Sequence, residues 1–141
     1  MSLGISDSGI VIGAGRTERA IAIDVVREFL EALGRRDLAA AQAYLAPGFV
    51  MTVPGGRAFR RLEEFFAEDA SRHGPVHKAL DGLEASEAPA GMAVYATGTM
   101  AGAWPDGTPF QGVRFCSRIV LRDSLVAEMQ VWNDLAEYRS G

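Results

Sequence analysis

An acidic stretch near the C-terminus is the first group of residues that could do chemistry. Glu128, Gln130, Trp132 and Asp134 alternate along one predicted strand and therefore share a face of it. A carboxylate that lies against apolar surface resists ionisation and can act as a proton acceptor or donor in a pocket. Asp134 or Glu128 is therefore a candidate acid/base group. Asp134 is also placed to cap a short helix that begins at Leu135.

A second candidate is the pair Asp69 and His73, which stand four residues apart on a predicted helix. This spacing puts both side chains on one helix face near Phe66, where the acid can orient the imidazole toward a pocket. The alternative is a pair that stabilises the helix end, where a cation is favoured. His77 stands alone on a strand and is more typical of a half-exposed strand residue.

Another predicted strand has two distinct faces. Arg114, Cys116 and Arg118 share the face that we expect to lie outside, where the arginines would form ion pairs between two copies or bind a ligand carboxylate. The opposite face, expected to line the core or a pocket, carries Val113, Phe115, Ser117 and Ile119. Cys116 has no base on its own face, which argues against nucleophilic catalysis. Tyr44 and Tyr95 could orient a ligand or lie at the core edge.

Residues 10–15, IVIGAG, look like the start of a dinucleotide-binding loop. Glu18 stands where that fingerprint needs its third glycine, and the following helix leads into another helix rather than a parallel strand. No other pattern indicates a metal, nucleotide or flavin. We therefore expect no cofactor.

Composition limits the function classes further. The chain has 141 residues, 48% hydrophobic and 23% charged, which is typical of one globular domain. Its net charge of −4 leaves no basic stripe for nucleic acid, and its single cysteine excludes an intrachain disulfide. No apolar run reaches about 18 residues, so no membrane partner is expected. The absence of a signal-peptide pattern favours a cytoplasmic protein.

The elements that must position these residues follow from hydrophobic periodicity. Residues 1–16 are predicted to form a flexible arm, and residues 17–141 a single domain. Helices are predicted at 17–33, 37–45 and 61–73, a short strand at 49–53, and long strands at 76–87, 92–103, 110–122 and 125–134. Short turns between the long strands predict antiparallel pairing. Such an α+β sheet curls around helices on one face and leaves an apolar pocket between them.

This order of elements resembles the nuclear-transport-factor-2-like cone and, within it, the SnoaL-like group. The resemblance covers residues 17–138, and its most specific segments are GTPFQGVRF at 107–115 and EMQVWNDLA at 128–136. It implies a cone-shaped α+β fold, with a curled antiparallel sheet packed on three N-terminal helices. This fold hosts cyclases, isomerases, dehydratases, epoxide hydrolases and non-catalytic binders, so it does not by itself settle function.

Two enzyme types on similar folds serve as tests. Ketosteroid isomerase needs an acid, a tyrosine and a protonated aspartate, and the resemblance places Phe29, Val53 and Phe115 at those positions. None of these can move a proton. Limonene-epoxide hydrolases use an Arg-x-Asp pair on a strand that here reads YATGT at 95–99. SnoaL-type polyketide cyclases resemble this chain more closely, because they need little more than one acid/base in an apolar pocket.

We therefore expect a homodimer, formed through the outer sheet face, that holds a small, mostly apolar molecule in its cone. The expected activity is cofactor-free cyclisation, isomerisation or hydration. The predicted catalytic residues are Asp134, Asp69 and His73, and the predicted ligand-binding residues are Trp132, Phe115, Phe66, Phe29, Val53 and Tyr95. The alternatives are a binding protein without catalysis and an interaction domain whose cone is filled by its own phenylalanines.

Overall fold

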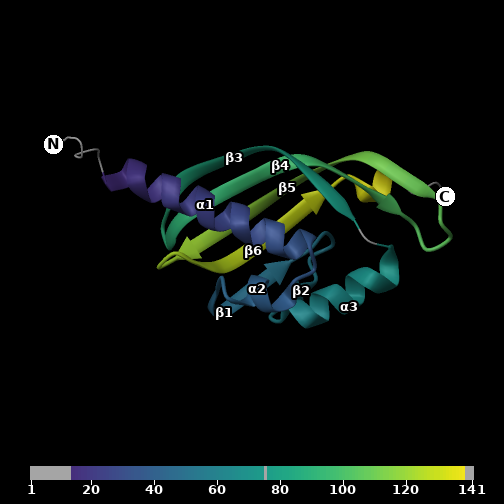
Figure 1. The fold of residues 1–141 in the computed structure, drawn as a ribbon, viewed down its shortest axis with the longest axis horizontal. Helices are drawn as coiled ribbons and strands as arrows, with labels where there is room; N and C mark the ends of the chain where they lie inside the picture. Colours follow the sequence, from purple (N-terminus) through teal and green to yellow (C-terminus); the bar gives the residue numbers. More distant parts are fainter. Residues whose placement is uncertain (1–13, 75, 139–141) are drawn as a thin grey trace.

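Three helices lie on one side of a curved six-stranded sheet in the computed structural model, which describes residues 14–74 and 76–138 (Figure 1). Most of the predicted N-terminal arm, residues 1–13, lies outside the described residues. The first helix, α1 (Ala14–Gly34), begins three residues before its expected start, inside the segment assigned to that arm. The described chain ends in a short 3-10 helix, η1 (Leu135–Tyr138).

The helices present small and apolar side chains to the sheet. In α1 the buried positions are Ala22, Val26, Phe29 and Ala32, which recur at the spacing of one helix face. The second helix, α2 (Leu38–Gln42), begins where expected, because the Asp37 carboxylate accepts a hydrogen bond from the Ala40 amide at 3.1 Å. The third, α3 (Leu62–Arg72), has glutamates in its first turn and Arg72 in its last, as the helix dipole favours.

The four long strands confirm the predicted meander. They are β3 (His77–Ala88), β4 (Gly91–Ala103), β5 (Pro109–Arg122) and β6 (Leu125–Asn133), and each pairs antiparallel with the next. The short strand is longer than predicted, β1 (Leu45–Thr52), and it pairs parallel with β6. A two-residue strand that the sequence did not indicate, β2 (Ala58–Phe59), completes the order β2-β1-β6-β5-β4-β3.

Irregular register curves the long strands. The pairing shifts between Leu80 and Gly82 in β3, and again between Met100 and Gly102 in β4. Such irregularities bend a strand and increase its twist. In Figure 1 the strands β3 to β5 arch over α1, while α3 lies near α2 and β2, on the same side of the sheet as α1.

A tight turn sets the register of β5 against β6. Asp123 and Ser124 both have left-handed backbone, with φ of 54° and 63°, between the paired residues Arg122 and Leu125. This is the geometry of a two-residue hairpin turn that matches the twist of its strands. Among the described residues, no helix is long and apolar enough to cross a membrane.

Candidate functional site

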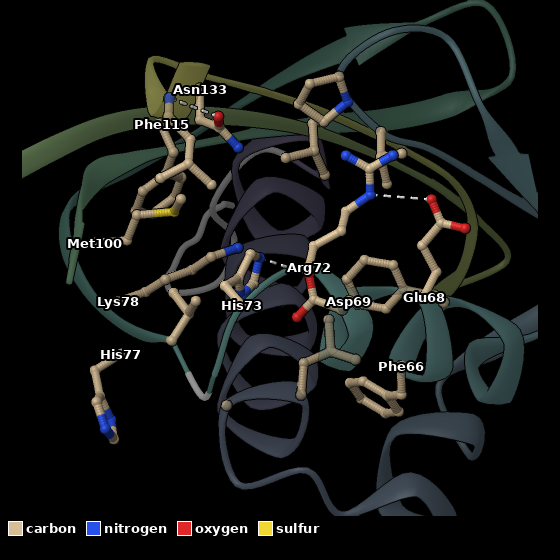
Figure 2. Close-up of a pocket in the computed structure, with 18 of the residues that line it drawn as sticks. Phe66, Glu68, Asp69, Arg72, His73, His77, Lys78, Met100, Phe115 and Asn133 are labelled. Carbon is tan, nitrogen blue, oxygen red and sulfur yellow. Dashed lines mark hydrogen bonds and ion pairs between the residues drawn. The ribbon is translucent and has the colours of Figure 1, made fainter. Parts of the chain in front are cut away.

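A cavity of about 1460 Å³ lies between α3, the end of α1 and the concave face of the sheet. Its apolar wall includes Met51, Val53, Phe66, Phe115, Met129 and Val131. Its polar wall includes Asp69, His73, Lys78 and Asn133 (Figure 2). Further charged side chains border the cavity as well, among them Arg36, Arg57, Glu68 and Arg72. A concave site that combines apolar surface with polar groups is a usual form of a small-molecule site.

Asp69 and His73 form an ion pair in this wall. The Asp69 Oδ1 lies 3.1 Å from Nε2 of His73, and Arg36 approaches the other Asp69 oxygen at 3.9 Å. The backbone adds to the arrangement, because α3 ends at His73 and the His73 amide donates to the Asp69 carbonyl. The imidazole is buried and stands edge-on to Phe110, with 6.3 Å between the ring centroids. The position of the ring is therefore fixed from three sides.

The partners of His73 determine where its protons are needed. Nδ1 lies 2.9 Å from the Gly74 carbonyl oxygen, which can only accept, so Nδ1–H donates to it. Nε2 faces a carboxylate, so this second bond also needs a proton, carried by the ring or by Asp69. The pair can therefore hold a proton, release it to a bound molecule and take it back. This is the chemistry of a general acid/base group.

Lys78 brings an amine to the same cavity from the start of β3. Its side chain keeps accessible surface because it lines the cavity, and its Nζ lies 4.9 Å from the centroid of the Phe115 ring. Loss of hydration among the surrounding protein atoms lowers the pKa of Lys78. The Asp69 carboxylate opposes this effect, and the Arg36 guanidinium adds to it. A Cβ at Gly98 would collide with the Ala79 carbonyl and press on the Phe115 ring, so this glycine makes room for that ring.

Asn133 ends β6 with its amide in the cavity wall. Its Oδ1 accepts a hydrogen bond from the Leu135 amide at 3.0 Å, which leaves the Nδ2 group directed at the cavity (Figure 2). Asn133 thus caps the first residue of η1 by accepting from its backbone amide, the role that the sequence predicted for Asp134. Its free amide hydrogens can donate to an oxygen of a bound molecule.

A comparison with known protein families identifies the fold. A model of the SnoaL-like domain matches residues 26–129. The chain belongs to the SnoaL-like family. No curated protein matches the chain significantly.

Solved structures share the SnoaL-like fold with this chain at low sequence identity. One is an NTF2-like protein of unknown function from Burkholderia pseudomallei, with a TM-score of 0.72 and 21% identity over 84% of this chain and 94% of that one. Another is a proposed polyketide cyclase from Xanthomonas campestris, with a TM-score of 0.69 and 18% identity over 86% and 96%. A third is an LEH-like epoxide hydrolase from M. tuberculosis, with a TM-score of 0.65 and 21% identity over 84% and 86%.

Five of the predicted residues line this SnoaL-like cavity. They are Asp69, His73, Val53, Phe66 and Phe115. The four-residue spacing of Asp69 and His73 predicted that their side chains lie side by side, and the structure shows this contact. Their catalytic and binding roles stay predictions. His77 also borders the cavity, but its ring points away from the other labelled side chains in Figure 2.

The face assigned to β6 was wrong. Met129, Val131 and Asn133 face the SnoaL-like cavity, whereas Trp132 is 51% exposed and Asp134 does not line the cavity. The Asp134 carboxylate instead accepts a hydrogen bond from Nε of Arg114 at 2.5 Å. Alternation separates the two faces of a strand without telling which one is inside.

Tyr95 and Phe29 also need correction as ligand-binding residues. Tyr95 is 38% exposed, and its hydroxyl accepts a hydrogen bond from Nε of Arg118 at 3.4 Å, outside the cavity wall. Phe29 is fully buried in the core, edge-on to Tyr44 with 6.4 Å between ring centroids. Because Phe29 packs there, it does not fill the cone together with Phe66 and Phe115.

The polar residues of the cavity that the sequence analysis did not single out include Lys78 and Asn133. Asn133 has a signal in the sequence, because the apolar Met129 and Val131 stand at i−4 and i−2 and therefore share its face of β6. The sequence feature that distinguishes Lys78 is that it is the only lysine in the chain. Among the described residues, no three His, Cys, Asp or Glu side chains gather as metal ligands.

Proposed function

We propose that this SnoaL-like chain binds a small, mostly apolar carbonyl compound in its cavity and catalyses a cofactor-free proton transfer on it. Isomerisation, cyclisation and hydration all include such a step. The observation that carries the proposal is the Asp69–His73 ion pair, which lies in the wall of the cavity. Asp134 does not line the cavity and has no part in the proposed reaction.

The groups of the cavity suit each stage of this transfer. The bound molecule packs its apolar body against Met51, Phe66 and Met129. Starting from the neutral imidazole with its proton on Nδ1, the Asp69 carboxylate takes a proton from the carbon beside the carbonyl and passes it to Nε2 of His73, so that the proton is held in the Asp69–imidazolium pair. The developing negative charge on the carbonyl oxygen is stabilised by hydrogen bonds from the amide of Asn133.

The similar structures support a small-molecule reaction, since they include a proposed polyketide cyclase and an epoxide hydrolase. The pairing of an acid with an imidazole favours proton transfer at carbon, as in a cyclase, over opening of an epoxide. The acid of the site is ion-paired with an imidazole, which suits proton abstraction from a carbon acid.

Exchange of carbon-bound protons tests the proposal. The full chain is incubated in D₂O with 2-tetralone or ethyl benzoylacetate, and deuterium uptake at the α-carbon is followed by NMR against a protein-free blank. We expect catalysed exchange that falls about 100-fold or more in His73→Asn. Asp134→Asn is the matched control, because this carboxylate lies outside the cavity wall, and it should retain the wild-type rate.

Binding is measured in parallel by thermal shift with the same compounds. A ligand at 100 times its Kd stabilises the fold by about 2.7 kcal/mol, which raises Tm by several degrees in a domain of this size. Exchange that persists in His73→Asn contradicts the proposed role of the pair. Binding without any catalysed exchange contradicts the enzyme and favours the non-catalytic binding protein.

A further inference from the structure

Lys78 is the only lysine among the 141 residues, and every other basic side chain of Lys or Arg type is an arginine. Arginine is always charged and does not act as a nucleophile, whereas a lysine amine does so once it loses its proton. The single position that carries this chemistry lies in the wall of the cavity. Lys78 lines the cavity but has no role in the proton transfer proposed for His73.

The surroundings of Lys78 keep its amine available. Within residues 14–74 and 76–138, no carboxylate forms an ion pair with Lys78 and no side chain accepts a hydrogen bond from it. Its Nζ stands over the apolar ring of Phe115, which is itself held in place by the close approach of Gly98 and Ala79. On the neighbouring strand, Lys78 is paired with the buried Met100. The amine therefore meets the face of an aromatic ring, which attracts its charged form, rather than a carboxylate.

We propose that Lys78 is a nucleophile that forms a Schiff base with an aldehyde or ketone bound in the cavity. This inference rests on the proposed function for the choice of a carbonyl compound. It adds a covalent step to the proton transfer, and it makes Lys78 a catalytic residue.

The step balances without any further reactant. The free amine of Lys78 attacks the carbonyl carbon, so that a C–N bond forms and the carbonyl oxygen takes up a proton. The nitrogen then loses a proton, which gives a carbinolamine. His73 lies in the same wall and can protonate the hydroxyl, which departs as water while the nitrogen lone pair forms the C=N bond. One water is released, and nothing is oxidised or reduced.

The imine would strengthen the chemistry proposed for His73. A protonated C=N group withdraws electrons more strongly than a carbonyl, so the neighbouring C–H becomes more acidic. The protein atoms around Nζ support the first step, because loss of hydration lowers the pKa of Lys78 and leaves more free amine at a given pH, while the side chain keeps accessible surface on the cavity side. The charged groups that act on it are Asp69, which opposes this shift, and Arg36, which adds to it.

Reductive trapping tests the Schiff base. The full chain is treated near neutral pH with cinnamaldehyde and sodium cyanoborohydride, and the adduct is counted by intact mass and located by peptide mapping. We expect one adduct on Lys78, distinct from any adduct on the α-amino group. Lys78→Arg should lose it, and a circular dichroism melt confirms that this variant is folded.

A matched control moves the single lysine to the outer face. The double variant Lys78→Arg, Arg114→Lys still has one lysine, but that amine is exposed to water, as Arg114 is. Lys78 in the natural chain should be trapped faster, because its lowered pKa leaves a larger share of its amine unprotonated. Equal rates overturn the proposal. If the variants do not fold, the comparison is made between Lys78 in the native chain and in the same chain unfolded in urea, and equal rates there overturn it too.

Exchange measurements separate this proposal from the proposed function. If Lys78 is not trapped while exchange of 2-tetralone still depends on His73 and survives Lys78→Arg, only the Schiff base is wrong. If Lys78 is trapped and Lys78→Arg slows the exchange, the covalent step is supported. If exchange does not depend on His73 in any chain, the proposed function fails, and trapping at Lys78 alone would still show a reactive amine.

Discussion

Two pairs of similar residue types lie on opposite sides of the sheet in different settings. On the outer face, Arg114 and Asp134 form an ion pair whose side chains are 81% and 33% exposed. Behind the inner face, His73 and Asp69 form an ion pair whose side chains are 8% and 24% exposed. Both pairs join a carboxylate to a nitrogen of a basic side chain. Only the second one borders the cavity.

The two pairs therefore differ in exposure and in access to the cavity, and not in the kind of groups that they join. Water and salt screen an exposed ion pair, so the outer pair contributes little beyond surface charge. Its effect is visible in Arg114, where the hydrogen bond to Asp134 raises the pKa of an arginine that is charged in any case. The inner pair is less exposed, so its charges are screened less by water and salt.

The largest expected effect compares a core ring with an exposed one. Phe29→Ala removes a fully buried ring, and we expect it to lower the free energy of unfolding by about 3–5 kcal/mol. Trp132→Ala removes a larger ring from the outer face, where the change should stay within about 0.5 kcal/mol at concentrations at which the chain is monomeric. Urea denaturation measures both. A cost for Trp132→Ala as large as that for Phe29→Ala would contradict the assigned faces.

Trp132→Ala also tests the expected homodimer. The dimer through the outer sheet face stays a prediction, and sedimentation velocity measures it. If the face forms a dimer, this variant should dissociate at concentrations where the natural chain does not. A dimer that is unchanged by the substitution would place the interface elsewhere.

The next effect compares the two carboxylates. Asp69→Asn keeps the shape of the side chain but removes the charge that stabilises His73, so α-proton exchange should fall by roughly 100-fold. Asp134→Asn should leave the exchange rate and Tm nearly unchanged, because that side chain only meets Arg114 on the surface. Equal losses in the two variants would show that location in the cavity is not what matters.

A pH-dependent effect follows from Lys78. An unfolded chain holds the lysine proton up to a pKa of about 10.4, whereas the folded chain releases it at lower pH. Between the two values the unfolded state binds more protons, so stability rises with pH across this interval. Lys78→Met should therefore raise Tm near neutral pH, and the gain should shrink as the pH approaches the value of the unfolded chain. A gain that does not change with pH would contradict the lowered pKa.

The smallest effect concerns the turn that sets which residues of β5 and β6 lie opposite each other. Ser124 has φ of 63°, which a non-glycine residue adopts at a cost of about 1–2 kcal/mol. Ser124→Gly gives the Asp-Gly turn preferred in this geometry, and we expect a net gain of about 0.5 kcal/mol after the entropy cost of glycine. Thermal unfolding checks it, with Asp106→Ala in another loop as a variant that should not stabilise.

The fold was largely predictable because its signals are local. Alternating side chains and short turns gave the long strands to within a residue or two, and Asp37 marked the start of α2. The parallel pairing of β1 with β6 was not predictable, since it depends on where the chain returns after a long excursion. A strand as short as β2 carries no periodicity at all.

The site was predictable only where it is local. Asp69 and His73 stand on one helix turn, so their spacing gave the pair. Asp134 and Trp132 were misplaced because both faces of β6 carry apolar residues, and alternation alone does not choose the buried one. The direction of Lys78 depends on the curvature and pairing of β3, which no local pattern encodes.

Methionine methyl NMR tests most directly whether the inner face is the ligand site. The chain is labelled with ¹³C-methyl methionine and titrated with 2-tetralone. Met51, Met100 and Met129 line the cavity, whereas Met92 does not, so Met92 is an internal control. We predict that the signals of the three cavity methionines shift on binding while that of Met92 stays in place. Binding detected by thermal shift with no change in these three signals would contradict the account.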